Sequence, residues 1–240
     1  LQCMIAYQYS YEKDGQLRKV YAYLALKTHT DFHAAVHQCA QYCWSEDCPE
    51  EHREDAAFYE QLFGRVSPYI DIDLEADNAS DSALRKVLAA AKLLDVPCGK
   101  LGTASTLVGT RLEDEGYKQS FHPIFSGAAA QPPPPEGASP DYPPRVLAAQ
   151  LAATCPGIDL AVYTPRRNFR VMGACKLGTG VPLVPRACIG NDGLFDRAAF
   201  HTWLTKTPPD SKKFRSFFVQ RGDDEPDQLN WTPPPSAAAQ

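Results

Sequence analysis

The chain has 240 residues, with 24 basic and 29 acidic side chains and a net charge of −5. Hydrophobic residues make up 44% of the sequence and charged residues 22%, which argues against wholesale disorder. The acidic balance disfavours nucleic-acid binding through bulk positive charge, and no apolar run reaches the roughly 18–20 residues needed to cross a bilayer. Because the N-terminus lacks a secretory pattern and begins at Leu1, we expect an intracellular piece of a longer protein without a membrane anchor.

Apolar periodicity predicts the elements of the first half of the chain. They are strands over 20–27 and 68–74 and helices over 31–42, 53–63 and 80–94. Asp31 is expected to be the N-cap of the helix over 31–42, and Gly64 is expected to end the helix over 53–63.

The second half of the chain alternates strands and helices around two segments of low complexity. We expect strands over 103–109, 117–125, 158–163, 168–174 and 214–219, and helices over 145–153 and 194–204. The third and fourth of these strands are expected to pair as a hairpin. Residues 126–144, rich in proline and alanine, predict an exposed loop inserted in one core of residues 1–221, and residues 222–240 predict a linker. This alternation predicts an α/β or α+β fold.

The eight cysteines are irregularly spaced and no secretory signal precedes them, so we expect free thiols in a reducing compartment. Six histidines and cysteines crowd one region: His29, His33, His37, Cys39, Cys43 and Cys48. They lack the two close ligand pairs of a structural zinc site. We therefore expect no structural zinc, and place His33 and His37 on a polar helix face.

Charge is distributed unevenly along the chain. Residues 46–81 contain twelve acidic side chains against two arginines, whereas residues 160–190 contain five basic side chains and no acidic one. An acidic edge opposite a basic edge is typical of a site that holds metal ions together with polyphosphate.

Asp71 and Asp73 lie in the segment Tyr69-Ile70-Asp71-Ile72-Asp73-Leu74. Side chains alternate along a strand, so the isoleucines enter the core while the two aspartates share the opposite face, about 6.6 Å apart at their attachment points. Carboxylates at this spacing repel one another unless a cation lies between them, and oxygen ligands suit Mg²⁺ or Mn²⁺. A solvated strand face that ends in a charged turn is the alternative.

Two further segments carry groups that can donate to phosphate. Lys118, Ser120 and His122 alternate along one strand and so share a face, which by itself is more typical of an ordinary edge strand. In the segment 158–176, Asp159 is the single acid on an apolar strand. Arg170 and Lys176 lie an even number of positions apart on the returning strand of the predicted hairpin, so both are expected on one face, where they can bind phosphate. Together the three segments hold the side chains of a two-metal phosphoryl-transfer site.

In this order, the DxD pair, Lys-x-Ser-x-His and IDLAVYTPRRNFR followed by a lysine resemble the archaeo-eukaryotic primase (AEP) superfamily, in particular its PrimPol-like branch. The resemblance implies a two-layer AEP or RRM-like core with mixed or antiparallel sheets flanked by helices. It implies that two Mg²⁺ or Mn²⁺ ions are held by Asp71, Asp73 and Asp159. It also implies that the nucleotide phosphates are contacted by Lys118, Ser120, His122, Arg167, Arg170 and Lys176, with Tyr163 near the sugar.

The activity implied by the resemblance is that of a DNA primase or DNA-directed polymerase. Its partners would be a single-stranded DNA template, a primer and dNTP or NTP substrates, with a helicase or zinc-binding module elsewhere in the same protein. Eukaryotic members usually have Asp-x-Glu where this chain has Asp71-Ile72-Asp73, and no zinc knuckle follows Lys176 here. Two alternatives are a non-catalytic AEP-fold adaptor that binds nucleic acid and a nucleotide-sugar transferase; the latter leaves the arginine segment without a role.

Overall fold

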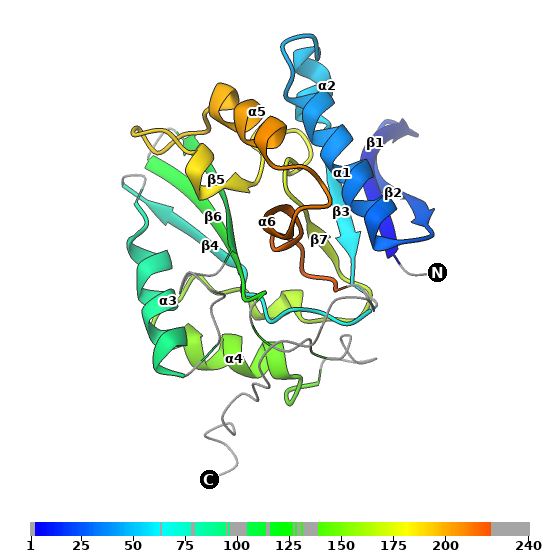
Figure 1. Cartoon of the computed structure of the whole chain (residues 1–240). Helices are drawn as coiled ribbons and strands as arrows, with labels where there is room; N and C mark the ends of the chain where they lie inside the picture. The colour runs from blue at the N-terminus through cyan, green and yellow to red at the C-terminus, as the bar shows by residue number, and fades with distance from the viewer. Residues whose placement is uncertain are drawn as a thin grey trace.

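The computed structural model describes residues 3–62, 64–77, 80–94, 96, 105–113, 116–126, 128, 131 and 139–221. These residues form a mixed α+β fold with two antiparallel four-stranded sheets and six α-helices (Figure 1). The expected mixture of helices and strands is confirmed at this level. None of the helices in these ranges is long and apolar enough to cross a membrane. The predicted linker at 222–240 and most of the loop at 126–144 lie outside the described residues. Where the structure describes this loop, the prediction that it is exposed is wrong in part: Ala128, Gln131 and Tyr142 are buried, and a helix begins at Pro143.

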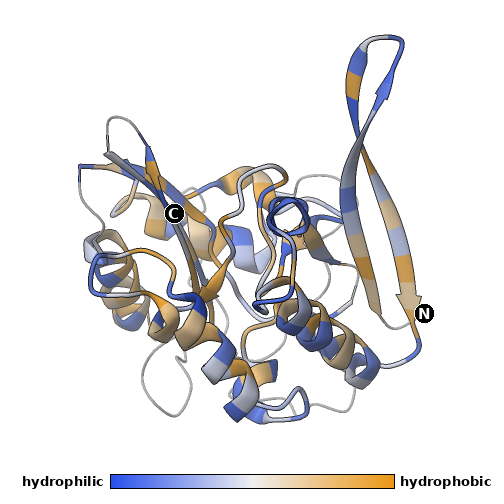
Figure 2. Cartoon of the chain, turned by 90° about the horizontal axis from the view of Figure 1, so that it is seen from above, coloured by the Kyte–Doolittle hydropathy of each residue, from blue (hydrophilic) through white to orange (hydrophobic). Residues whose placement is uncertain are grey.

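The first sheet has the strand order β2-β1-β3-β7. Its strands are β1 (Cys3–Lys13), β2 (Gln16–Leu26), β3 (Phe58–Gln61) and β7 (Asn168–Arg170). A two-residue turn joins β1 to β2, and both Asp14 and Gly15 have positive φ, as a type I′ hairpin turn requires. The hairpin rises well away from the rest of the chain (Figure 2).

The second sheet has the order β4-β6-β5-β8. Its strands are β4 (Ile72–Ala76), β5 (Ser105–Glu113), β6 (Gly116–Ile124) and β8 (Val184–Pro185). Ile72 pairs with Phe121, and both side chains are fully buried. Because neighbours along a strand point to opposite faces, this buried pair turns Asp73 and Ser120 to the other face.

The helices pack around two buried clusters. They are α1 (His29–Cys43), α2 (Glu50–Glu54), α3 (Ser82–Leu93), α4 (Pro143–Ala152), α5 (Arg197–Lys206) and α6 (Lys212–Arg215). The first cluster joins β4 and β6 to α3 and α4 through side chains such as Val87 and Leu147. The second joins the base of the β1–β2 hairpin to α1, α5 and α6 through Val36, Phe200 and Phe214.

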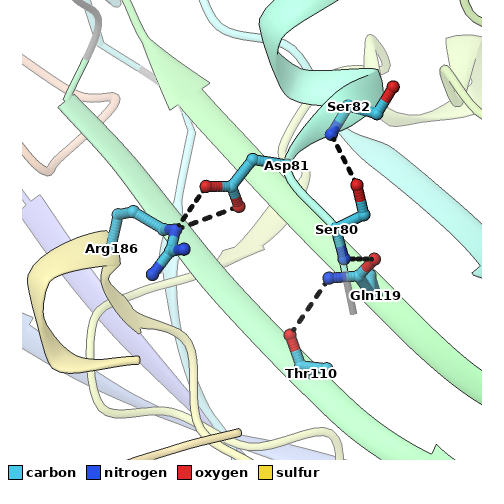
Figure 3. A network of polar contacts seen from close by, with 6 residues as sticks. All are labelled: Ser80, Asp81, Ser82, Thr110, Gln119 and Arg186. Atoms are coloured by element: carbon cyan, nitrogen blue, oxygen red, sulfur yellow. Dashed lines mark hydrogen bonds and ion pairs between the residues drawn. The ribbon is translucent and has the colours of Figure 1, made fainter. Parts of the chain in front are cut away.

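A network of polar contacts fixes the start of α3 against the second sheet (Figure 3). The buried side chain of Gln119 accepts a hydrogen bond from the N–H of Ser80 at 3.1 Å and donates to Oγ1 of Thr110 at 3.5 Å. Nε of Arg186 lies 2.9 and 2.8 Å from the two carboxylate oxygens of Asp81. The side chain of Gln119 therefore lies on the face of β6 opposite to that of Ser120, where it holds the start of α3.

Two expectations about α1 were wrong. Thr28 is the N-cap, and Asp31 is the third residue of the helix, where it completes a capping box with Thr28. His33 and His37 do not lie on a polar face: both are buried, and their rings lie 4.8 Å from that of Phe218 and 5.1 Å from that of Phe214, respectively. The seven described cysteines are free.

Four predicted elements differ from the observed structure. The helix expected over 53–63 ends at Glu54, and Phe58 and Tyr59 lie in β3, because that segment pairs with β1 and β7. The strands expected over 158–163 and 168–174 do not pair: residues Leu160–Val162 form a short 3₁₀ helix (η1), and β7 pairs with β3. The final strand expected over 214–219 is occupied by α6 and a turn.

Candidate active site

The pairing of β4 with β6 brings two of the predicted motifs onto one face. Asp73 lies opposite Ser120, and Glu75 lies opposite Lys118. Oδ1 of Asp73 accepts a hydrogen bond from the Ser120 hydroxyl, and Oε1 of Glu75 lies 3.7 Å from Nζ of Lys118. The acidic and the donor motif therefore form successive cross-strand contacts, as antiparallel pairing allows.

Asp71 and His122 make the next contact along this face, at its buried end. Nε2 of His122 lies 3.2 Å from Oδ1 of Asp71, with the two side chains 2% and 14% exposed. Burial by itself raises the pKa of the Asp71 carboxyl, but His122, Arg170 and Arg167 outweigh it and hold that pKa below its usual value. Asp71 is therefore an ionised carboxylate in a largely dry position.

Arg170 connects this face to the first sheet. It is the last residue of β7, and its Nη2 donates to the Ser120 hydroxyl at 3.3 Å. Ser120 in turn donates to Asp73, so the guanidinium and the carboxylate share one hydroxyl. A cationic fork is thus positioned beside the two acids, where it can bind a phosphate oxygen.

Asp159 lies beside Asp71 although the two are far apart in the sequence. The N–H of Asp159 donates to the carbonyl of Asp71 at 2.9 Å, and the N–H of Asp73 donates to the carbonyl of Gly157 at 2.8 Å. Gly157 permits this approach, because a Cβ there would lie 2.6 Å from the carbonyl oxygen of Asp73. The carboxylate of Asp159 accepts from the N–H of Ala161 at 2.7 Å and so caps η1.

The remaining predicted cations lie farther from the acids. Arg167 is exposed, and its charge adds a small contribution that lowers the pKa of the Asp71 carboxyl. Lys118 contacts Glu75 and not the aspartates. Lys176 is not on the predicted hairpin: it is exposed in a loop held against the start of β3, where the N–H of Cys175 donates to the carbonyl of Ala56 at 2.7 Å.

The donor chemistry of the site fits a hard divalent cation. Oδ1 of Asp71 is a buried, ionised carboxylate oxygen that faces Nε2 of His122 at 3.2 Å, and Asp73 and Asp159 lie on the strand segments next to it. Within the described residues, however, no three His, Cys, Asp or Glu side chains are gathered as ligands. Asp159 would have to leave its cap on Ala161 to complete a three-carboxylate set.

Two buried aromatic residues, Tyr163 and Phe169, pack against the site in positions that the sequence did not predict. Tyr163 is not available to a sugar: it is 1% exposed, and its hydroxyl donates to the carbonyl of Tyr69 at 2.7 Å. The ring of Phe169 lies 4.6 Å from that of His122. In the sequence, the only sign of this packing is that Tyr163 and Phe169 flank Arg166 and Arg167. Which residues they contact depends on the tertiary structure.

A separate groove of about 1080 Å³ lies between the end of α1 and the start of α5. Its lining includes Trp44, Asp47, Asp192, Phe195, Arg197 and His201. None of the predicted site residues lies in it, so the groove and the carboxylate site are distinct features.

A scan against protein-family models finds no match for this chain, and a search of curated proteins finds no significant relative.

Proposed function

We propose that this chain is a metal-dependent, template-directed nucleotidyltransferase of the primase–polymerase kind. One observation carries the proposal: a backbone hydrogen bond between Asp159 and Asp71 joins acids from two distant segments, two residues from Asp73, which shares the Ser120 hydroxyl with Arg170. Carboxylates next to a phosphate-binding cation are what transfer of a nucleotidyl group requires. The resemblance of the three motifs to the primase superfamily supports the same function.

In this function each side chain has a defined task. Asp71, Asp73 and Asp159 would hold Mg²⁺ or Mn²⁺, which when bound supplies positive charge to the attacking hydroxyl and the leaving pyrophosphate. Arg170 would orient a phosphate of the incoming nucleotide through its guanidinium. The Ser120 hydroxyl would hold the Arg170 guanidinium and the Asp73 carboxylate close together, because it donates to Asp73 and accepts from Arg170.

The substrates in this proposal are a deoxynucleotide or ribonucleotide triphosphate and the 3′-hydroxyl of a primer on a single-stranded DNA template. Lys118, Arg167 and Lys176 are exposed or half-exposed and, in this proposal, would meet the outer phosphates of a bound nucleotide. The more specific AEP-like core is part of this proposal, and the pair of antiparallel sheets is compatible with it.

Extension of a fluorescent primer on a DNA template, with Mg²⁺ or Mn²⁺, tests the proposal. The wild type is expected to add nucleotides, and Asp71→Asn to lose this activity. Asp210→Asn, which changes an exposed carboxylate in the turn after α5, serves as the control and should extend the primer normally. Normal extension by Asp71→Asn would refute the assignment of the site.

A second function, a non-catalytic module that binds nucleic acid within a replication complex, is favoured by one observation. The Asp159 carboxylate is engaged in a helix cap rather than turned to the other acids. Primer extension separates the two functions, because an adaptor binds the template but forms no product with either metal.

A further inference from the structure

The β1–β2 hairpin extends beyond the sheet from which it starts. Only Ile5, Ala6 and Tyr7 of β1 pair with β3, whereas β1 and β2 pair with each other over their whole length. In Figure 2 the outer half of the hairpin stands clear of the rest of the described chain. Its side chains are therefore accessible from both faces.

Exposed tyrosines occupy both faces of this hairpin. Tyr7, Tyr9 and Tyr11 alternate along β1 and share one face, the Tyr9 face. Tyr21 and Tyr23 share the opposite face, the Tyr21 face, with ring centroids 6.3 Å apart. All five side chains are 40–50% exposed. Rows of half-exposed aromatic rings without a covering element are costly to leave in water, which indicates a binding surface.

The Tyr21 face continues into the candidate active site. The Tyr21 ring packs edge-on against that of Tyr59, with centroids 5.8 Å apart. Tyr59 lies opposite Arg170 in the pairing of β3 with β7, so the two share a face of the sheet. Arg170 then donates to Ser120 at 3.3 Å. A continuous path of contacts therefore runs from the hairpin to the acids, and it starts from the Tyr21 face.

We propose that the Tyr21 face binds single-stranded nucleic acid, with bases stacked on Tyr21 and Tyr23 and the strand directed toward Arg170. This inference rests on the proposed function, because it supplies the template or primer strand to that site. Successive aromatic rings beside basic side chains are a general way to bind single strands without sequence preference. Lys19 lies on the same face two residues from Tyr21, and Glu12 lies on it nearer the turn, opposite Leu17.

Two observations favour a nucleic acid over a second copy of this chain as the occupant: the Tyr21 face leads to Arg170, and the hairpin as a whole is less acidic than the rest of the chain. Residues 3–26 carry three basic and two acidic side chains, whereas the whole chain has a net charge of −5. β2 is an edge strand, and an edge is where two copies could pair. The charged side chains of Arg18 and Lys19 on that edge oppose such pairing.

Fluorescence anisotropy with a labelled 20-nucleotide oligothymidine, measured on the full chain without nucleotide or divalent metal, tests the inference. The double variant Tyr21→Ala/Tyr23→Ala is expected to raise the Kd about ten-fold or more, since each stacked ring contributes substantially to binding. The matched control is Tyr9→Ala/Tyr11→Ala, which removes rings of similar exposure from the opposite face and should leave the Kd within about two-fold.

The conservative variant Tyr21→Phe/Tyr23→Phe keeps the rings and should restore wild-type binding, which separates stacking from a folding defect. Equal losses on both faces, or wild-type binding by Tyr21→Ala/Tyr23→Ala, would overturn the inference. The inference would also be overturned if light scattering showed that the wild type is a dimer and that Tyr21→Ala/Tyr23→Ala is a monomer. Because the binding assay contains no metal or nucleotide, these results can fail while primer extension succeeds, and the converse also holds.

Discussion

The wild type is expected to lose stability as the pH rises from about 4.5 to about 7, because of the buried carboxyl of Glu60. The variant Glu60→Gln is expected to lack this part of the decline. Glu60 is buried on β3, and its carboxylate accepts hydrogen bonds from the N–H groups of Val219 at 2.8 Å and Gln220 at 2.9 Å. Burial raises the pKa of this carboxyl to about 7, and the two N–H donors limit the rise. The folded protein therefore holds a proton that the unfolded chain releases near pH 4.5.

The sign follows from proton linkage. A raised pKa in the folded state stabilises it fully below pH 4.5, and this contribution is lost as the pH passes about 7. At 1.36 kcal/mol per pH unit, the free energy of unfolding should fall by about 3 kcal/mol over this interval on account of Glu60. Glutamine cannot titrate, so Glu60→Gln should lack this part of the decline.

Urea unfolding of both proteins at closely spaced pH values measures the effect. The difference in unfolding free energy between wild type and Glu60→Gln should change by about 3 kcal/mol between pH 4.5 and 7.5. Glu51→Gln, an exposed change in α2, is the control and should run parallel to the wild type. Parallel curves for wild type and Glu60→Gln would refute the reasoning.

Three further changes probe the site. Arg170→Ala should raise the KM for the nucleotide more than it lowers kcat in steady-state primer extension; an unchanged KM would remove Arg170 from phosphate binding. Gly157→Ala should lower stability by about 1–3 kcal/mol in chemical denaturation, because its Cβ would meet the backbone of Asp73, and wild-type stability would contradict the close approach. Tyr163→Phe should cost about 1–2 kcal/mol in the same assay by removing a buried hydrogen bond, and a neutral effect would show that this bond contributes nothing.

The motif on β4 and β6 was predictable because it depends only on the two-residue period of a strand. Alternation places Asp71 and Asp73 on one face of their strand and Ser120 and His122 on one face of the next, and the structure pairs the two. No spacing in the sequence shows that Asp159 reaches the same edge, because that contact depends on a glycine that allows two backbones to approach.

The errors come from tertiary pairing that local patterns do not encode. Phe58 and Tyr59 fit a helical spacing, yet they lie in a strand because β1 and β7 are available on either side. Arg170 lies in a strand as predicted, although that strand pairs with β3 and not with residues 158–163. The chain turns away at Gly173, where φ is +81°, so Lys176 lies outside the strand. The β1–β2 hairpin was only half predicted, since its tyrosines form no buried face to mark β1.

The most direct test of the central claim is a double-mutant cycle of Asp71→Asn and Asp159→Asn in primer extension with Mn²⁺. If both acids serve one site, each single variant should lose most of the activity, and the double variant should be about as slow as either one. Wild-type rates in either single variant, or losses that multiply in the double variant, would contradict the claim.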